Sequence, residues 1–169
     1  MQTITTSQLV LEPLTVAHAE AMFEVLADSK IYRYLDYPPP PSVEHLRDVY
    51  TRLEARKSPN GDQIWLNWVV RPHGHPPVGY VQATIASTGS AWIAYVLSSK
   101  YWGRGYAHLA THVVMENLTT AYGVVRYLAT VEAENCRSIR LLERLAFRPA
   151  LSHEAAGHNL SATERLFVR

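Results

Sequence analysis

The alternation of apolar and polar residues divides the chain into strand patterns and helix patterns. Runs rich in β-branched and aromatic residues, which favour strands, occupy 8–12, 63–70, 78–86, 91–97, 125–132 and 164–168. Apolar residues at the 3.6-residue spacing of an amphipathic helix occupy 16–28, the segment after Ser42, 104–121 and the segment after Asn135. The predicted order of elements is therefore β-α-α-β-β-β-α-β-α-β.

Capping residues and helix breakers set several boundaries. Thr15, Ser42 and Asn135 each precede a helical pattern and are predicted N-cap residues. The segment 36–41, DYPPPP, is predicted to be a stiff loop, because proline lacks the backbone N–H and has a fixed φ angle. The inward face of the last helix is predicted to consist of Ile139, Leu142, Leu145 and Ala146.

The connections between the strands predict the sheet. The turns PHGHPP at 72–77 and STGS at 87–90 separate three consecutive strands and indicate an antiparallel meander. The strand–helix–strand sequence over 91–132 indicates a right-handed parallel crossover. The expected fold class is therefore α/β (α+β), with a mixed sheet covered by helices on both faces. A chain of 169 residues suits a single domain spanning 1–169.

Composition excludes several classes of function. Lys and Arg number 16 and Asp and Glu number 15, so the net charge of +1 gives no broad basic surface for nucleic acid or an anionic membrane. The single cysteine, Cys136, excludes an internal disulfide and a cysteine-rich zinc site. His108 and His112 have the i, i+4 spacing of a metal-binding pair but no third ligand, so no metal is expected.

Hydropathy predicts a soluble, cytoplasmic protein. The opening segment MQTITTSQLVLEP lacks the basic and apolar regions of a signal peptide. No segment approaches the roughly 18 uninterrupted apolar residues of a membrane-spanning helix.

The segment 101–107, YWGRGYA, carries the most specific chemistry of the chain. It joins a predicted strand to a predicted helix, whose N-terminus offers unpaired N–H groups and the positive end of the helix dipole. Gly103 and Gly105 would let a phosphate approach those N–H groups, and Lys100 and Arg104 add positive charge. A nucleotide, a dinucleotide and the pyrophosphate of coenzyme A are the candidate ligands.

Two of these ligands fit the spacing poorly. A P-loop requires G-x-x-x-x-G-K-[ST], which the chain lacks. The dinucleotide fingerprint requires Gly or Ala three residues after the second glycine, where this chain has His108, and it follows the first strand of a βαβ unit rather than a meander. A strand-to-helix turn without a ligand is the alternative interpretation.

Two motifs resemble the GNAT acyltransferase family. Lys100-x-x-Gly103-x-Gly105 resembles the acetyl-CoA signature [QR]-x-x-G-x-[GA], with lysine at the first position. The segment from Asn135 to Phe147 resembles the N-x-x-[AS]…x-G-F segment of the same family. Its serine and ERLAF ending, together with the N-terminal strand, helix and proline-containing loop, are similar to the RimJ- and RimL-type branch of ribosomal-protein N-acetyltransferases.

The resemblance implies a GNAT fold that holds acetyl-CoA in a V-shaped gap between strands 91–97 and 125–132. It implies that the pantetheine arm pairs with the first of these strands, that the pyrophosphate lies on the N–H groups of the turn, and that Asn135 contacts the arm or positions the second wall. The cofactor-binding residues implied in this way are Tyr95, Val96, Leu97, Lys100, Trp102, Gly103, Arg104, Gly105, Tyr106, Ala107, Asn135 and Ser138.

The implied reaction is direct acetyl transfer to a primary amine through a tetrahedral intermediate. An alkylamine has a pKa of about 10, so a base must remove a proton, and a backbone N–H near Val96 or Leu97 is expected to stabilise the oxyanion. Many members of the family carry a tyrosine acid seven residues after the motif asparagine, where this chain has Leu142. Ser138 is the expected substitute donor. The candidate bases are Glu132, Glu134 and Glu154.

The acceptor is left open by these patterns. Asp36, Tyr37, Trp65 and Trp68 are predicted to contact it, since they lie in the proline-containing loop and the first meander strand. A peptide or protein N-terminus, a polyamine, an amino acid and an antibiotic are all compatible, and a homodimer is common in the family. The missing tyrosine favours one alternative function, a catalytically weak acyl-CoA-binding or sensor module. A nucleotide-binding protein with a coincidental turn is a third.

Overall fold

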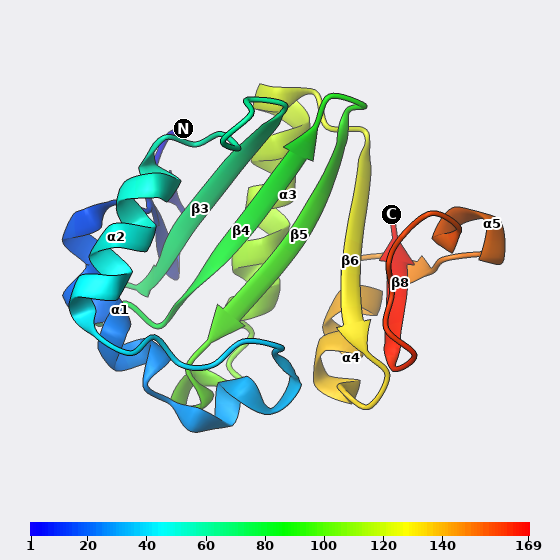
Figure 1. Cartoon of the computed structure of the whole chain (residues 1–169). Helices are drawn as coiled ribbons and strands as arrows, with labels where there is room; N and C mark the ends of the chain where they lie inside the picture. Colours follow the sequence, from blue (N-terminus) through cyan, green and yellow to red (C-terminus); the bar gives the residue numbers. More distant parts are fainter.

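The computed structural model describes residues 1–169, and a mixed eight-stranded sheet runs through its centre (Figure 1). The strands lie in the order β1-β2-β3-β4-β5-β6-β8-β7. All neighbours are antiparallel except β5 and β6, which are parallel. The strands are β1 (Ile4–Thr5), β2 (Leu9–Pro13), β3 (Gln63–Pro72), β4 (Gly79–Ala86), β5 (Ser90–Leu97), β6 (Arg126–Glu132), β7 (Arg148–Pro149) and β8 (Glu164–Val168).

Helices cover both faces of the sheet. They are α1 (Ala19–Leu26), α2 (Val43–Glu54), α3 (Tyr106–Tyr122), α4 (Cys136–Arg144) and the short α5 (Ser152–Ala155), with 3₁₀ segments η1 (Val16–His18), η2 (Ser29–Tyr34) and η3 (Ser99–Tyr101). In Figure 1, α1 and α2 lie at the left, on the near side beside β3, and α3 lies behind the sheet. We call the side of α1 and α2 the front face and the side of α3 the back face.

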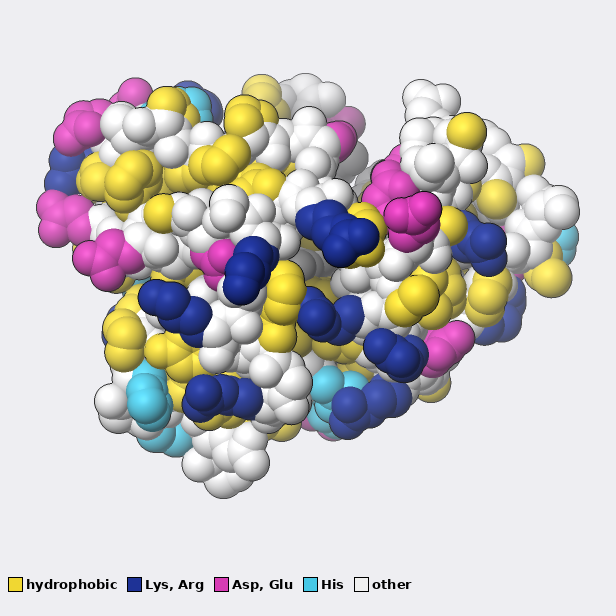
Figure 2. Space-filling view, turned by 90° about the horizontal axis from the view of Figure 1, so that it is seen from below, with side chains coloured by type: hydrophobic (Ala, Val, Ile, Leu, Met, Phe, Trp, Pro, Cys, Tyr) yellow, Lys and Arg dark blue, Asp and Glu magenta, His cyan; other side chains and the backbone are white.

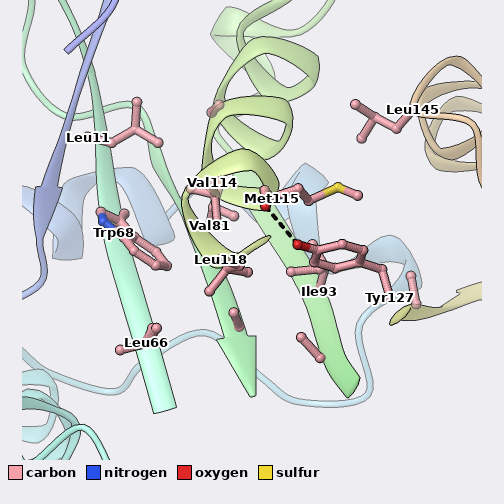
Figure 3. Close-up of a cluster of buried hydrophobic side chains, with 14 of the residues drawn as sticks. Leu11, Leu66, Trp68, Val81, Ile93, Val114, Met115, Leu118, Tyr127 and Leu145 are labelled. Carbon is pink, nitrogen blue, oxygen red and sulfur yellow. Dashed lines mark hydrogen bonds between the residues drawn. The ribbon is translucent and has the colours of Figure 1, made fainter. Parts of the chain in front are cut away.

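The larger core lies on the back face, between the sheet and α3. Alternate residues of each strand point to this side, and they pack against the apolar stripe of α3. Figure 3 shows this cluster, in which the hydroxyl of Tyr127 donates to the carbonyl oxygen of Met115 at 2.7 Å. A second cluster joins α1 and α2 to Val69 and Val96 on the front face.

The strand and helix order expected from the sequence is confirmed, and two capping predictions hold. The Ser42 hydroxyl accepts from the N–H of His45 at 3.1 Å, and the Asn135 carbonyl oxygen accepts from the N–H of Ser138 at 3.2 Å. The short strands β1 and β7 and helix α5 were not expected. The inward position of Ala146 is wrong, because the residue is exposed beyond the end of α4 with a left-handed φ of 61°.

The parallel pair β5–β6 opens along its length. The two strands are in register only from Ser90–Arg126 to Trp92–Leu128. Beyond Trp92, β5 continues to Leu97 and β6 continues to Glu132 without pairing with each other. The sheet is thus split at the end that leads into η3 and α3 on one side and into α4 on the other.

Candidate active site

The register of β5 decides which backbone groups face the split. The N–H of Ser98 donates to the carbonyl oxygen of Val78, and antiparallel pairs that exchange hydrogen bonds recur at every second residue. Val96 therefore bonds to Tyr80 of β4, whereas the backbone groups of Tyr95 and Leu97 point toward β6. Of the three β5 residues expected to pair with an arm in the split, Tyr95 and Leu97 present backbone groups to it and Val96 does not.

The glycine turn at the mouth of the split presents free N–H groups. Gly103 and Gly105 have φ angles of 78° and 80°, in the left-handed region that glycine adopts without strain. The backbone N–H groups of residues 103–108 have no acceptor within the chain, and the first bond of α3 runs from the N–H of Leu109 to the carbonyl of Gly105. Six adjacent donors at a helix N-terminus form a site suited to a phosphate group.

Basic side chains surround this turn. The Arg104 guanidinium lies 5.3 Å from the Tyr101 ring centre, and that of Arg137, from the first turn of α4, lies 3.8 Å from the Trp102 ring centre. Figure 2 views the molecule from this end and shows Lys and Arg side chains spread across it. The net charge of +1 hides this local accumulation, which complements an anionic ligand.

Two contacts hold the turn against the sheet. The indole N–H of Trp102 donates to the carbonyl oxygen of Leu97 at 2.8 Å. The Asp28 carboxylate accepts from the backbone N–H of Ser99 at 2.6 Å and from the hydroxyl of Ser98 at 3.1 Å. Asp28 lies where α1 passes into η2, so it ties the front-face loop to the start of the glycine turn.

The second wall of the split is the N-terminus of α4. Asn135 caps this helix, and the Tyr95 hydroxyl donates to the backbone carbonyl of Ser138 at 3.4 Å, across the split. Burial raises the pKa of the Tyr95 hydroxyl to about 12, so it stays protonated at neutral pH. Leu142, at the position where the family resemblance implies a tyrosine acid, is 1% exposed and belongs to the core.

The front face is open beside the split. Ala94 of β5 and Thr130 of β6 are exposed although both lie inside strands. Helices α1 and α2 bound this strip on one side, and the segment after β7, which packs on Leu128 and Leu166, bounds it on the other. Figure 2 shows a hollow between these two parts at the upper edge of the view.

Tyrosine side chains line the α1–α2 side of the strip. The hydroxyls of Tyr37 and Tyr80 lie 3.0 Å apart, and the rings of Tyr32 and Tyr37 meet edge to face. Burial raises the pKa of Tyr37 and of Tyr80, so both are neutral hydrogen-bonding groups at physiological pH. Asp36 precedes Tyr37 in the same loop and is exposed. The predicted contacts of Asp36 and Tyr37 with an acceptor stay predictions.

The two tryptophans of β3 lie on opposite faces. Trp65 is half-buried on the front face, and its indole N–H donates to the side chain of Gln63 at 3.0 Å. Trp68 is 0% exposed in the back-face core (Figure 3). Its indole N–H donates to the carbonyl of Gln2 at 3.3 Å. The expected contact of Trp68 with the acceptor is therefore wrong, because strand alternation turns it away from the open strip.

Glu154, one of the bases that the sequence suggested, is held in ion pairs with two arginines. Its carboxylate pairs with Arg148 at 2.7 Å and with Arg126, the first residue of β6, at 3.2 Å. Hydrogen bonds from Arg148 and from the N–H of Leu151 lower its pKa to about 2. A carboxylate with so low a pKa is a poor proton acceptor at neutral pH. A groove of about 530 Å³ adjoins it, lined also by Trp92, Leu128 and His158.

Glu132 keeps a position compatible with a base. It ends β6 at the open side of the split, and its cross-strand partner is Glu164 of β8. Residues directly opposite each other share a face, and Leu128 places this register on the front face, so both carboxylates lie on the front face, and that of Glu164 accepts from the N–H of Ser161 at 2.9 Å. Glu164 was not expected from the sequence, because β6–β8 pairing brings together residues distant in the chain. Glu134 lies beyond β6, is exposed, and its backbone carbonyl accepts from the Tyr34 hydroxyl at 3.3 Å.

Neither a metal site nor a membrane span is found. No group of three or more His, Cys, Asp or Glu side chains is arranged to hold a metal ion. The rings of His108 and His112 stack at 6.3 Å on α3, and His112 lies 3.4 Å from Glu116. A helix of the length and hydropathy needed to cross a membrane is absent.

Comparison with known proteins agrees with this geometry. The family model described as "Acetyltransferase (GNAT) domain" matches residues 8–148. The chain is 26% identical over 150 residues to the uncharacterized N-acetyltransferase p20 of Bacillus licheniformis. The aligned region covers 88% of this chain and 83% of that protein.

Solved structures show the same fold. A GNAT-family acetyltransferase from Bacillus anthracis superposes with a TM-score of 0.77 at 20% identity, covering 99% of this chain and 98% of that one. RimL, a ribosomal L7/L12 alpha-N-protein acetyltransferase in complex with coenzyme A, superposes with a TM-score of 0.82 at 17% identity, covering 99% and 97%. The ribosomal-protein-S5-alanine acetyltransferase of Vibrio fischeri gives 0.80 at 15%, covering 100% and 96%.

Proposed function

This chain belongs to the GNAT family of N-acetyltransferases, and from that premise we propose that it moves the acetyl group of acetyl-CoA directly to a primary amine. The observation that carries the proposal is the split between β5 and β6, with a row of free N–H groups at its mouth. The RimL structure contains coenzyme A, which supports the choice of cofactor.

In the proposed complex, the pyrophosphate of acetyl-CoA lies on the N–H groups of residues 103–108. Arg104, Lys100 and Arg137 supply positive charge around it. The pantetheine arm then enters the split and pairs with the free backbone groups of Tyr95 and Leu97, as an added strand would. Because the arm enters at the turn, the thioester lies toward the closed end of the split.

The transfer itself needs a base, an oxyanion donor and a donor to the leaving sulfur. The acceptor ammonium loses a proton to Glu132, directly or through water, and the amine nitrogen then attacks the thioester carbonyl carbon. An inward-facing N–H of β5, that of Tyr95 or Leu97, stabilises the oxyanion. When the carbon–sulfur bond breaks, the thiolate accepts a hydrogen bond or proton from the hydroxyl of Ser138 or of Tyr95.

A second candidate function rests on Leu142. The tyrosine acid that many relatives carry at this place is replaced by a buried leucine. A chain that binds acetyl-CoA but lacks an effective acid would act as a sensor of acyl-CoA. The Tyr95 hydroxyl favours the enzyme, because it lies next to Ser138 of α4 and provides a donor at that wall.

Two measurements in sequence test the proposal. Acetyl-CoA or CoA at 100 times its dissociation constant should stabilise the fold by about 2.7 kcal/mol, while ATP and NAD should not. Release of free CoA with a panel of primary amines then separates an enzyme from a sensor. Stabilisation without any release would support the sensor, and absence of stabilisation by either CoA form would refute both.

A further inference from the structure

Asn67 is a mostly buried residue whose side-chain carboxamide forms no hydrogen bond within the chain. It is 8% exposed, and its carboxamide, with two N–H donors and one carbonyl acceptor, has no partner within the chain. The buried Ser58 and Ser98 hydroxyls, by contrast, donate to Asp62 and Asp28. The fully buried side-chain atoms without a partner belong to other residues, so the polar atoms of Asn67 reach the surface of the front face and are open to a bound molecule.

A second free carboxamide lies beside it. Gln82 of β4 is the cross-strand partner of Asn67, so both side chains point to the same face. Gln82 is half-buried and also forms no side-chain hydrogen bond. Its chain neighbours Val81 and Ala83 belong to the back-face core, which places Gln82 and Asn67 on the front face.

The carboxamide pair lies next to β5, the strand that borders the split. The partner of Gln82 on β5 is Ala94, which is exposed and has only a methyl side chain. Ala94 precedes Tyr95, whose backbone faces the split toward its closed end, where the thioester is proposed to lie. An amine that attacks from the front face would therefore pass over Ala94. The two carboxamides would then lie on the side of the amine that faces α2.

The opposite side of the strip differs in charge. Glu132 and Glu164 lie side by side at the end of β6 and β8. The strip therefore has anionic groups near β6 and neutral donors and acceptors near β3 and β4. A ligand that matches both sides carries an ammonium group at one end and an uncharged polar group next to it.

We propose that Asn67 and Gln82 form the acceptor-specificity site and bind an uncharged amide group adjoining the reacting amine. An α-amino amide has this chemistry, as in an aminoacyl amide or the first residue of a peptide. Its carbonyl accepts from a side-chain N–H and its N–H donates to a side-chain carbonyl oxygen. A polyamine would instead place a second ammonium against two neutral carboxamides, where nothing balances its charge. This inference rests on the proposed acetyltransferase function.

The experiment compares two acceptors of the same shape. Alaninamide and 3-methyl-2-butylamine differ only in that an isopropyl group replaces the carboxamide. We expect Gln82→Leu to lower kcat/KM for alaninamide by about tenfold, because a hydrogen bond to a desolvated partner is lost. The kcat/KM for 3-methyl-2-butylamine and the KM for acetyl-CoA should stay unchanged.

Thr84→Val is the matched control. Thr84 lies two residues further along β4 on the same face, and removal of its hydroxyl should change neither acceptor. The Asn67→Ala variant should show the same selective loss of kcat/KM for alaninamide, and its melting curve should match that of the wild type. An equal loss for both amines, or no loss for alaninamide, would overturn the inference. So would a wild-type preference for spermidine over alaninamide.

A failure of the proposed acetyltransferase function would give a different result from a failure of the amide site. If the wild-type protein acetylated neither amine, binding of alaninamide to the CoA-saturated protein would be measured by calorimetry. Binding that weakens in Gln82→Leu but not in Thr84→Val would support the amide site without catalysis. Absence of such binding would overturn it.

Discussion

At the level of single residues, the two glycines of the turn are required for conformation. A Cβ added at Gly103 or Gly105 would meet no atom of the chain within 4 Å, yet both residues have φ near 80°. The space above them is therefore available to a ligand, and the left-handed backbone aims the following N–H groups outward.

Substitution Gly103→Asp should weaken acetyl-CoA binding by at least about tenfold, because it places a carboxylate where the pyrophosphate is proposed to lie. Isothermal calorimetry measures this. Gly157→Asp is the control, since Gly157 has a φ of 89° in an exposed loop, so it introduces the same strain and charge elsewhere. Equal affinity in the two variants would contradict the assigned phosphate site.

Glu154 is expected to act on stability rather than on catalysis. Its pKa is about 2 in the folded chain, mainly through Arg148, against an ordinary value of 4.5. A carboxylate with a lowered folded pKa stabilises the fold above pH 4.5, and this contribution is lost as the pH falls toward 2.

Glu154→Gln should therefore lower the melting temperature at pH 7, with a difference from wild type that shrinks as the pH falls below 4.5. Differential scanning calorimetry over this range provides the test. The pH dependence of kcat should be unchanged, whereas Glu132→Gln should reduce kcat. A changed pH–rate profile in Glu154→Gln would restore it as a candidate base.

At the level of elements, Asn135 shows how one side chain links helix formation to the site. Its carbonyl oxygen caps α4 by accepting from the N–H of Ser138, and we propose that its amide N–H₂ binds the pantetheine arm. Asn135→Ala should reduce stability by about 1 kcal/mol through loss of the cap. Asn135→Asp keeps an acceptor for the cap but removes the amide donor.

We therefore expect Asn135→Asp to retain the urea midpoint of the wild type and to bind acetyl-CoA more weakly. Urea unfolding and calorimetry on the same samples separate the two roles. If the Asp variant bound as tightly as the wild type, the asparagine would serve only as a cap.

At the level of the whole molecule, the split sheet predicts a pattern of backbone protection. The N–H of Val96 bonds to β4, whereas those of Tyr95 and Leu97 face the split. In the free protein the latter two amides should exchange with deuterium at least about tenfold faster than that of Val96. Saturating acetyl-CoA should slow the exchange of Tyr95 and Leu97 selectively, as measured by NMR. A uniform change would argue against strand addition in the split.

Much of the fold and the glycine turn could be predicted from residues that lie close together in the sequence. Strand alternation, the caps at Ser42 and Asn135, and the proline loop predict the elements and their order, because these signals depend on residues a few positions apart. The glycine turn and its following helix are likewise predictable, since left-handed φ angles and free helix N–H groups are properties of the segment itself.

The choice among similar side chains depends on the folded sheet. Trp65 and Trp68 have the same local pattern, but pairing with β4 and covering by α3 decide that only Trp65 lies on the front face. Glu154 and Glu132 are both plausible carboxylates, and only β6–β8 pairing and the arginines of distant segments separate them. Asn67, Gln82 and Ala94 come from three strands and meet only through register. Contacts between residues far apart in the chain set these roles, which is why the turn was predictable and the acceptor site was not.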